Sequence, residues 1–375
     1  MDNGIPYGWK NSSNILQLSP LMYNNSSNIK LSRETDEEKK IYSENEKAPF
    51  YFTIGNVRLL VHGGIYLDLF TIPQFYRLSG IKQLGTLNGH YMFAGAEHTR
   101  HQHSIDTAIR VESAVSRLYP NNIELINLAI ASGMLHDIFT PPFSEHGKFG
   151  NRKGLDEEYN INRVFNYPEI LEVLEKYSID PNELISVIRG EHPKLGKLLN
   201  SDQLDIDKIS YTNMDGRFVV PHYTEPEKFE VYASNPMQFI QESVALTEDG
   251  DIAFTDAYAV RDILIRRAEL FTGVYSSELN RAREAFLEPE LERLWENHDL
   301  TVDKILEMND IELKNFLRDR IDPIIFYELF EIFSDKFEEY NRIENDDLAL
   351  CRIYGSQILS RMRVIRWFIR ILSFY

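Results

Sequence analysis

Cysteine is almost absent from this sequence, since Cys351 is the one cysteine in 375 residues. A single cysteine excludes an intrachain disulfide and a cluster of thiolate metal ligands, which fits a reducing compartment. Long apolar runs are missing too, because none reaches the roughly 18 residues of a membrane span. The N-terminus also lacks the basic and apolar regions of a signal peptide. These features predict a soluble, cytoplasmic protein with no membrane partner.

Positive charge is also in deficit. The chain has 40 Lys and Arg against 58 Asp and Glu, a net charge of −18, with a pI near 5.1. Strong nucleic-acid binding, which needs a broad basic surface, is therefore not expected, although a local basic pocket for phosphates is compatible with this balance. A hydrophobic content of 43% supports a real core, in one large domain or two.

The spacing of apolar residues predicts a mostly α-helical fold, with small β-elements near the N-terminus and around 220–255. We expect a flexible N-terminal arm over 1–48, a main domain over 49–298 and a helical C-terminal region over 299–375. The expected helices cover 73–84, 105–118, 126–135, 156–177 with a break at Pro168, 182–189, and 256–295 with breaks near Gly273 and Pro289. The basic amphipathic end, 361–372, is expected to pack on the body or on a neighbouring subunit.

Two short stretches concentrate the chemistry. His136 and Asp137 directly follow the apolar run 126–135, and burying both without partners would cost several kcal/mol in rough terms. A metal ion would be such a partner, because imidazole and carboxylate are both ligands of first-row metals; a buried ion pair or a helix cap is the alternative. Asp207, Tyr211 and Asp215 share one stripe of a helix, which suits a cleft or a solvated face.

His103, His136–Asp137 and Asp207 stand in the order H…HD…D. This order resembles the HD-domain phosphohydrolase superfamily, and in particular its deoxynucleoside triphosphate triphosphohydrolases, the branch of the sterile-alpha-motif HD-domain dNTPase and the bacterial dGTPases. Four stretches carry the likeness: TIPQFYRLSGIKQLG at 71–85, FAGAEHTRHQHS at 93–104, DIDKISYTNMD at 205–215 and RDILIRRA at 261–268. The resemblance covers roughly residues 52–290.

The resemblance implies an HD-domain helical core and a divalent metal ion, with Mn, Fe, Zn and Mg all compatible with the ligands His103, His136, Asp137 and Asp207. It implies that phosphates are bound by Arg100, Lys208 and Arg261, and that the sugar pocket is lined by Gln83, Leu84, Tyr211 and Asp215. It also implies a homo-oligomer, with an allosteric nucleotide site in some members.

The loop after the HD pair departs from the family. Thr140 stands where a His or Asn touches the α-phosphate, and Glu145 replaces a His with a role in catalysis, with His146 one residue later. The family's next His-Glu pair falls on Asp156 and Glu157. The candidates for general acid–base work are therefore Glu145, His146, Asp156 and Glu157, provided that burial raises a carboxyl pKa.

The favoured prediction is a metal-dependent hydrolase that converts a deoxynucleoside triphosphate into deoxynucleoside and triphosphate. The preserved sugar-pocket residues favour this substrate. The altered loop favours two alternatives: an HD phosphohydrolase with another nucleotide or phosphoester as substrate, and a catalytically weak nucleotide sensor or regulatory protein.

Overall fold

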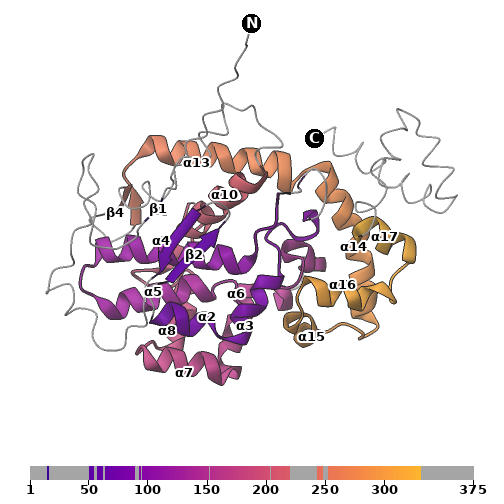
Figure 1. Ribbon diagram of the computed structural model, residues 1–375, viewed down its shortest axis with the longest axis horizontal. Helices are drawn as coiled ribbons and strands as arrows, with labels where there is room; N and C mark the ends of the chain where they lie inside the picture. Colours follow the sequence, from indigo (N-terminus) through magenta and orange to yellow (C-terminus); the bar gives the residue numbers. More distant parts are fainter. Residues whose placement is uncertain are drawn as a thin grey trace, which may run out of the picture.

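The computed structural model in Figure 1 is built mostly of α-helices, which confirms the predicted fold class. It describes residues 15–16, 50–54, 57–61, 64–88, 93, 95–151, 153–202, 204–219, 243–247 and 252–330. The helices in the first half are α2 (Ile65–Phe70), α3 (Pro73–Arg77), α4 (Arg100–Leu118), α5 (Ile123–Leu135), α6 (Glu157–Asn160), α7 (Pro168–Lys176), α8 (Pro181–Ile188) and α9 (Gly196–Leu199). Those that follow are α10 (Ile206–Val219), α13 (Ala257–Leu270), α14 (Glu278–Glu296), α15 (Val302–Glu307), α16 (Asp310–Arg318) and α17 (Pro323–Phe330).

Two small sheets accompany the helices. Strand β3 (Val57–Val61) lies between β1 (Ile15–Leu16), to which it is parallel, and β2 (Phe50–Ile54), to which it is antiparallel. Strands β4 (Val244–Leu246) and β5 (Ile252–Phe254) form an antiparallel pair. Strands β2 and β3 and the β4–β5 pair lie where small β-elements were expected, whereas β1 lies within the arm that was expected to be flexible.

Helices α4 and α5 form the centre of the core and carry the first metal-ligand candidates. Helix α4 begins after Thr99, whose hydroxyl accepts from the Gln102 amide while the Gln102 side chain accepts from the Thr99 amide, a reciprocal cap that fixes the first turn. Gly133 lets α5 approach α4 closely, since a Cβ atom there would lie 2.5 Å from the Ala108 Cα. The cap and this contact place the starting turn of α4 beside the end of α5.

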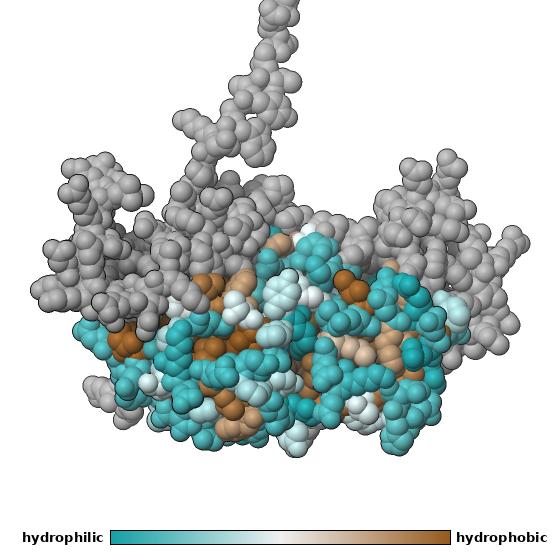
Figure 2. Space-filling model, turned by 60° about the horizontal axis from the view of Figure 1, so that its bottom comes forward, coloured by the Kyte–Doolittle hydropathy of each residue, from teal (hydrophilic) through white to brown (hydrophobic). Residues whose placement is uncertain are grey.

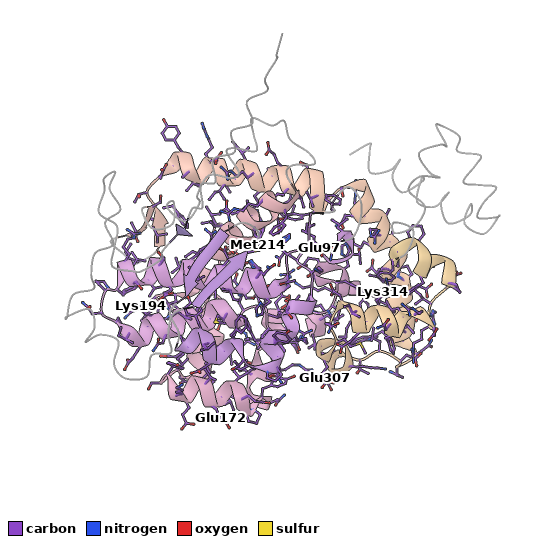
Figure 3. The ribbon with its side chains drawn as sticks, viewed as in Figure 1. Glu97, Glu172, Lys194, Met214, Glu307 and Lys314 are labelled. Carbon is purple, nitrogen blue, oxygen red and sulfur yellow. The ribbon has the colours of Figure 1, made fainter. Side chains whose placement is uncertain are left out.

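Helix α10 packs on α4, and α13 packs on α10 along the upper side of the view in Figure 1. Figure 3 shows Met214 of α10 inside the body, where it is 4% exposed. Glu172 of α7, Lys194 and Glu307 of α15 lie at the periphery of the same view and are exposed. Figure 2 shows a face whose described surface is mostly hydrophilic (teal), with smaller hydrophobic patches (brown) between the hydrophilic residues.

A second apolar cluster joins the C-terminal helices to the loop after the HD pair. Phe143, Phe149 and Leu155 pack among buried residues of α14 to α17. Two polar anchors reinforce this contact: Arg77 donates to the carbonyl groups of Met308, Ile138 and Thr140. The carboxylate of Asp310 accepts from the backbone amides of Lys82 and Phe143.

Several helix boundaries differ from the prediction. The helix expected over 73–84 gives way to a 3₁₀ turn over Leu78–Gly80, because Lys82 instead pairs with Thr99 in a β-bridge. Pro168 does separate two helical stretches, and a π-turn over Phe271–Tyr275 separates α13 from α14 near Gly273. The predicted break at Pro289 was wrong, since α14 continues through this residue. Burial of its neighbours Leu287 and Leu291 holds the apolar face of the helix against the core. This burial offsets the roughly 3 kcal/mol that a proline costs inside a helix.

Within the described residues, no helix is both long and apolar enough to cross a bilayer. The arm over 1–48, apart from Ile15 and Leu16, and the basic end over 361–372 lie outside the described residues, as do residues 220–242. The domain boundaries at 48 and 298 stay predictions.

Candidate metal centre and cleft

Two imidazoles and one carboxylate converge where α4, α5 and α10 meet. His103 lies in the first turn of α4, His136 directly after α5, and Asp207 in the first turn of α10. The two Nε2 atoms are 3.2 Å apart. Oδ1 of Asp207 lies 2.8 Å from Nε2 of His103 and 3.3 Å from Nε2 of His136. Three ligand atoms from three helices thus face one point.

The outer nitrogen of each imidazole is held by a partner. Nδ1 of His136 donates to the Gly133 carbonyl at 2.8 Å. Nδ1 of His103 lies 3.3 Å from the Ser210 hydroxyl, which donates its own proton to Asp106 at 2.8 Å, so that Nδ1 is the donor. When these rings are neutral, both Nε2 atoms therefore carry lone pairs toward Asp207, which is the tautomer that a metal ligand needs.

The electrostatics of this cluster favour a cation. Burial lowers the pKa of His136, but Asp137 and Asp207 outweigh burial and raise that pKa to about 9. Oδ1 of Asp207 is buried without a well-aligned hydrogen bond. Without a metal, the His136 imidazole balances this negative charge by holding a second proton. A divalent ion bound by His103, His136 and Asp207 would take the place of that proton.

Asp137, the fourth predicted ligand, lies beside this cluster. Its Oδ2 is 3.8 Å from Nε2 of His103 and 3.7 Å from Nε2 of His136. The carboxylate is buried and accepts from Arg100 Nη1 at 2.9 Å and from the Thr140 hydroxyl at 3.2 Å. Burial raises the pKa of Asp137, yet Arg100 and the two imidazoles hold it well below its usual value. Its role as a ligand stays a prediction.

The centre opens on a cleft of about 460 Å³, within the roughly 300–1,000 Å³ of small-molecule sites. Besides the four metal-ligand candidates, the cleft is lined by nine residues that the sequence predicted for substrate binding or catalysis: Gln83, Leu84, Arg100, Glu145, His146, Glu157, Lys208, Tyr211 and Asp215. The structure thus gathers most of the predicted constellation on one surface.

Three predicted residues do not line the cleft. Thr140 is fully buried and its hydroxyl supports Asp137. Asp156 caps the start of α6 by accepting from the Tyr159 amide at 2.9 Å. Arg261 is exposed on α13 with its guanidinium over the Tyr258 ring. The described geometry therefore gives no support to phosphate contact by Thr140 or Arg261. It gives none to catalysis by Asp156 either.

The carboxylates of Glu145 and Glu157 share one cation, Lys148. Its Nζ lies 3.0 Å from Glu145 Oε1 and 2.8 Å from Glu157 Oε1. Partial desolvation raises the pKa of Glu145, but the nearby charges of Lys148 and Arg100 lower it by more. The net pKa is below the ordinary value, so this carboxylate stays ionised. For Glu157, burial outweighs Lys148 and raises the pKa. Glu157 therefore suits a general acid better than Glu145 does.

Arg100 and Lys208 are both engaged with protein groups. Nε of Arg100 donates to Ser144 at 3.0 Å and Nη2 to Glu145 at 3.3 Å, in addition to its bond to Asp137. Nζ of Lys208 donates to Asp205 at 2.6 Å and to the Ser201 carbonyl at 2.8 Å. A phosphate in the cleft would share these cations with carboxylates.

The partners that hold Asp215 and Tyr211 in the cleft were not predicted. Asp215 accepts at 2.6 Å from Nε2 of His98, which stacks on Phe218, and it also accepts from the Tyr275 hydroxyl. The Tyr211 hydroxyl accepts from Arg267 at 2.7 Å. His98 belongs to the histidine-rich stretch 98–103, which was a usable signal.

The comparisons with known proteins agree with this geometry. No family model matches the chain. It is 28% identical over 239 residues to the uncharacterized protein YwfO of Bacillus subtilis, which covers 62% of this chain and 52% of that protein. It is 31% identical over 152 residues to the human deoxynucleoside triphosphate triphosphohydrolase SAMHD1, which covers 35% of this chain and 24% of that enzyme. The chain thus spans about half of the first relative and about a quarter of the second.

A solved structure of a hypothetical protein from Aquifex aeolicus shares the fold, with a TM-score of 0.54 and 24% identity over 78% of this chain and 76% of that chain. Together with the His–His–Asp cluster, these matches show that the chain is a relative of the HD-domain proteins, as the sequence resemblance predicted. Its partial likeness to SAMHD1 covers a stretch of 152 residues.

Proposed function

We propose that this protein is a metal-dependent phosphohydrolase of the HD type and that its substrate is a deoxynucleoside triphosphate. The observation that carries the proposal is the convergence of His103, His136 and Asp207 beside a cleft large enough for a nucleotide. The metal-dependent hydrolase class is supported by the ligand atoms and their tautomers. The choice of a deoxynucleoside triphosphate as substrate is supported by the cleft residues and by the partial likeness to SAMHD1.

The residues of the chain support hydrolysis in distinct ways. A divalent ion held by His103, His136 and Asp207 would polarise a phosphoryl oxygen and lower the pKa of a water molecule. Arg100 orients Asp137 and lies where it can donate its remaining N–H groups to a phosphate. Glu157, with its raised pKa, is placed in the cleft to give a proton to the leaving oxygen.

The sugar pocket supports a deoxyribose. Tyr211 lines the cleft, and its ring lies 6.5 Å from the His103 ring. Its hydroxyl is held by Arg267, so the ring is fixed as an apolar wall close to the metal centre. Gln83 and Leu84 line the same cleft, and Asp215 supplies a carboxylate for a sugar hydroxyl.

One observation favours a second substrate class, a phosphoester of lower charge. Seven carboxylates line the cleft, against the two cationic side chains Arg100 and Lys208: they are Asp137, Glu145, Glu157, Glu158, Asp207, Asp215 and Glu284. A triphosphate would meet this negative field unless bound cations offset it. A monophosphate or a phosphodiester would be repelled less.

Product analysis distinguishes these proposals. The full chain is incubated with Mn²⁺ and, separately, with each dNTP, with dGMP and with bis(p-nitrophenyl) phosphate, and the products are separated by ion-exchange chromatography. We expect deoxynucleoside and intact triphosphate from the dNTPs, and loss of this activity in Asp207→Ala. Turnover of the monophosphate or diester alone would support the second class. Absence of any turnover in the metal-loaded protein would refute the enzymatic proposal.

A further inference from the structure

A group of polar atoms without partners lines the cleft where three elements meet. These elements are the 3₁₀ turns η2 (Gly85–Leu87) and η4 (Ser144–Gly147) and the helix α14. Gly85 lies so close to η4 that a Cβ atom would be 2.3 Å from the Phe143 carbonyl and 2.5 Å from Nδ1 of His146. The turns are therefore packed tightly, and the His146 ring is held in place.

His146 offers one hydrogen-bond donor to the cleft. Its Nδ1 accepts from the Thr86 amide at 3.4 Å. Burial lowers the pKa of His146 to about 4, although the Asn280 side chain, which lies within hydrogen-bonding reach of the ring, favours the charged form, so the ring is neutral near pH 7. A neutral ring that accepts at Nδ1 carries its proton on Nε2. Nε2 makes no well-aligned hydrogen bond among the described residues, and His146 is 92% buried and lines the cleft.

Two acceptors lie in the same cleft. Asn280 of α14 donates its amide to the Tyr275 carbonyl at 2.8 Å, which fixes its orientation, and its Oδ1 has no hydrogen-bond partner among the described residues. Oε1 of Gln83 has no partner there either, and Gln83 is 92% buried. Buried polar atoms are rarely left unpaired in a protein, so a ligand that pairs with these three is indicated.

We infer that His146 and Asn280 form a hydrogen-bonding subsite that reads the edge of a nucleobase, next to Gln83 of the proposed sugar pocket. This inference rests on the proposed nucleotide substrate and assigns His146 to binding, where the sequence favoured catalysis. Each nucleobase carries neighbouring donor and acceptor groups on its edge, which complement the donor Nε2 and the acceptor Oδ1.

The surroundings fit a flat ring better than a phosphate. Leu84, Leu87, Phe271 and Tyr275 line the cleft as apolar walls, and the last two are in edge-to-face contact at 5.1 Å. Such walls suit the faces of a base. Two acceptor oxygens would repel an anion, which leaves a base or a sugar as the group that the subsite can bind.

Equilibrium dialysis of the full chain against neutral deoxynucleosides tests the inference without turnover. We expect wild type to prefer some bases over others, and His146→Leu to weaken binding of the preferred one by about tenfold or more, the loss of one good hydrogen bond. His146→Gln keeps a donor near Nε2 and should restore part of the preference. Thr86→Val is the matched control, because the Thr86 hydroxyl is buried without a partner but Thr86 does not line the cleft.

The outcomes separate the inference from the proposed function. Base preference that is unchanged in both His146→Leu and Asn280→Ala, with native melting curves, would overturn the subsite and leave nucleotide hydrolysis intact. An equal loss in the affinity for 2-deoxyribose would overturn it in favour of a sugar contact. If wild type binds no deoxynucleoside and hydrolyses no dNTP, the proposed function fails and the subsite fails with it.

Discussion

Replacing Arg100 by Gln should destabilise the metal-free protein strongly. Arg100 is 7% exposed and its guanidinium lies against Asp137, which is 2% exposed. Without the guanidinium, the Asp137 carboxylate would keep the hydrogen bond from the Thr140 hydroxyl at 3.2 Å. Removal of one partner from a buried ion pair costs roughly 3–5 kcal/mol, because the other charge stays buried. We expect a fall of this size in the free energy of unfolding.

Metal should recover part of this loss. An ion at His103, His136 and Asp207 would bring positive charge close to Asp137, since Oδ2 of Asp137 lies within 3.8 Å of both Nε2 atoms. Binding stabilises the folded state by RT ln(1 + [M]/Kd). The stabilisation by Mn²⁺ should therefore be larger in Arg100→Gln than in wild type.

The assay is urea unfolding followed by circular dichroism, with EDTA and with Mn²⁺. Arg110→Gln is the matched control: Arg110 is a buried arginine on the same helix, and its ion pair with Asp106 has a 2.6 Å contact. The Arg110→Gln variant should lose a similar amount of free energy of unfolding in EDTA, and Mn²⁺ should stabilise it no more than it stabilises wild type. The reasoning fails if Arg100→Gln costs less than about 1 kcal/mol in EDTA, the range of an exposed pair, or if both variants respond to Mn²⁺ alike.

Three further predictions concern the scaffold around the site. Asp310→Ala should lower the free energy of unfolding by roughly 2–4 kcal/mol, because it strips an acceptor from two backbone amides; urea unfolding measures this, and a loss under about 0.5 kcal/mol would show that water replaces the carboxylate. Gly133→Ala should cost roughly 1–3 kcal/mol by forcing α5 away from Ala108, and an unchanged melting temperature would contradict the close packing. His101 has a pKa lowered to about 4 by burial, below the ordinary value of about 6.5, so the unfolded state binds its proton first as the pH falls. Its contribution to stability is complete above pH 6.5 and is lost as the pH falls toward 4, by up to about 3 kcal/mol. His101→Phe should remove this part of the acid destabilisation, and an equal pH slope in wild type and variant would refute the assignment.

The metal cluster could be anticipated because its signal is local. His136 follows directly on an apolar helix, and Asp207, Tyr211 and Asp215 are spaced by one helical turn each, so all three face the cleft together. The partners that fix these side chains could not be anticipated in the same way. Lys148 bridges Glu145 and Glu157, and the His98 and Tyr275 contacts to Asp215 depend on how distant helices pack.

Helix lengths were harder to predict for the same reason. The apolar periodicity over 73–84 is genuine, but the β-bridge between Lys82 and Thr99 ends the helical stretch at Gly80. Pro289 disfavours a helix locally, yet burial of Leu287 and Leu291 keeps α14 continuous. Tertiary contacts decided both cases against the local preference.

The altered loop after the HD pair connects the chemistry of the site to the C-terminal helices. Asp310 of α16 binds the Phe143 amide, and Phe143 adopts a left-handed backbone with φ of 62°, a conformation that needs support from its surroundings. The next residue, Ser144, contacts Arg100. This chain of contacts runs from α16 through the loop to the partner of Asp137. Residues beyond about 290, where the sequence resemblance ends, therefore support the loop that holds Thr140, Glu145 and His146, the loop in which the sequence departs from the family pattern.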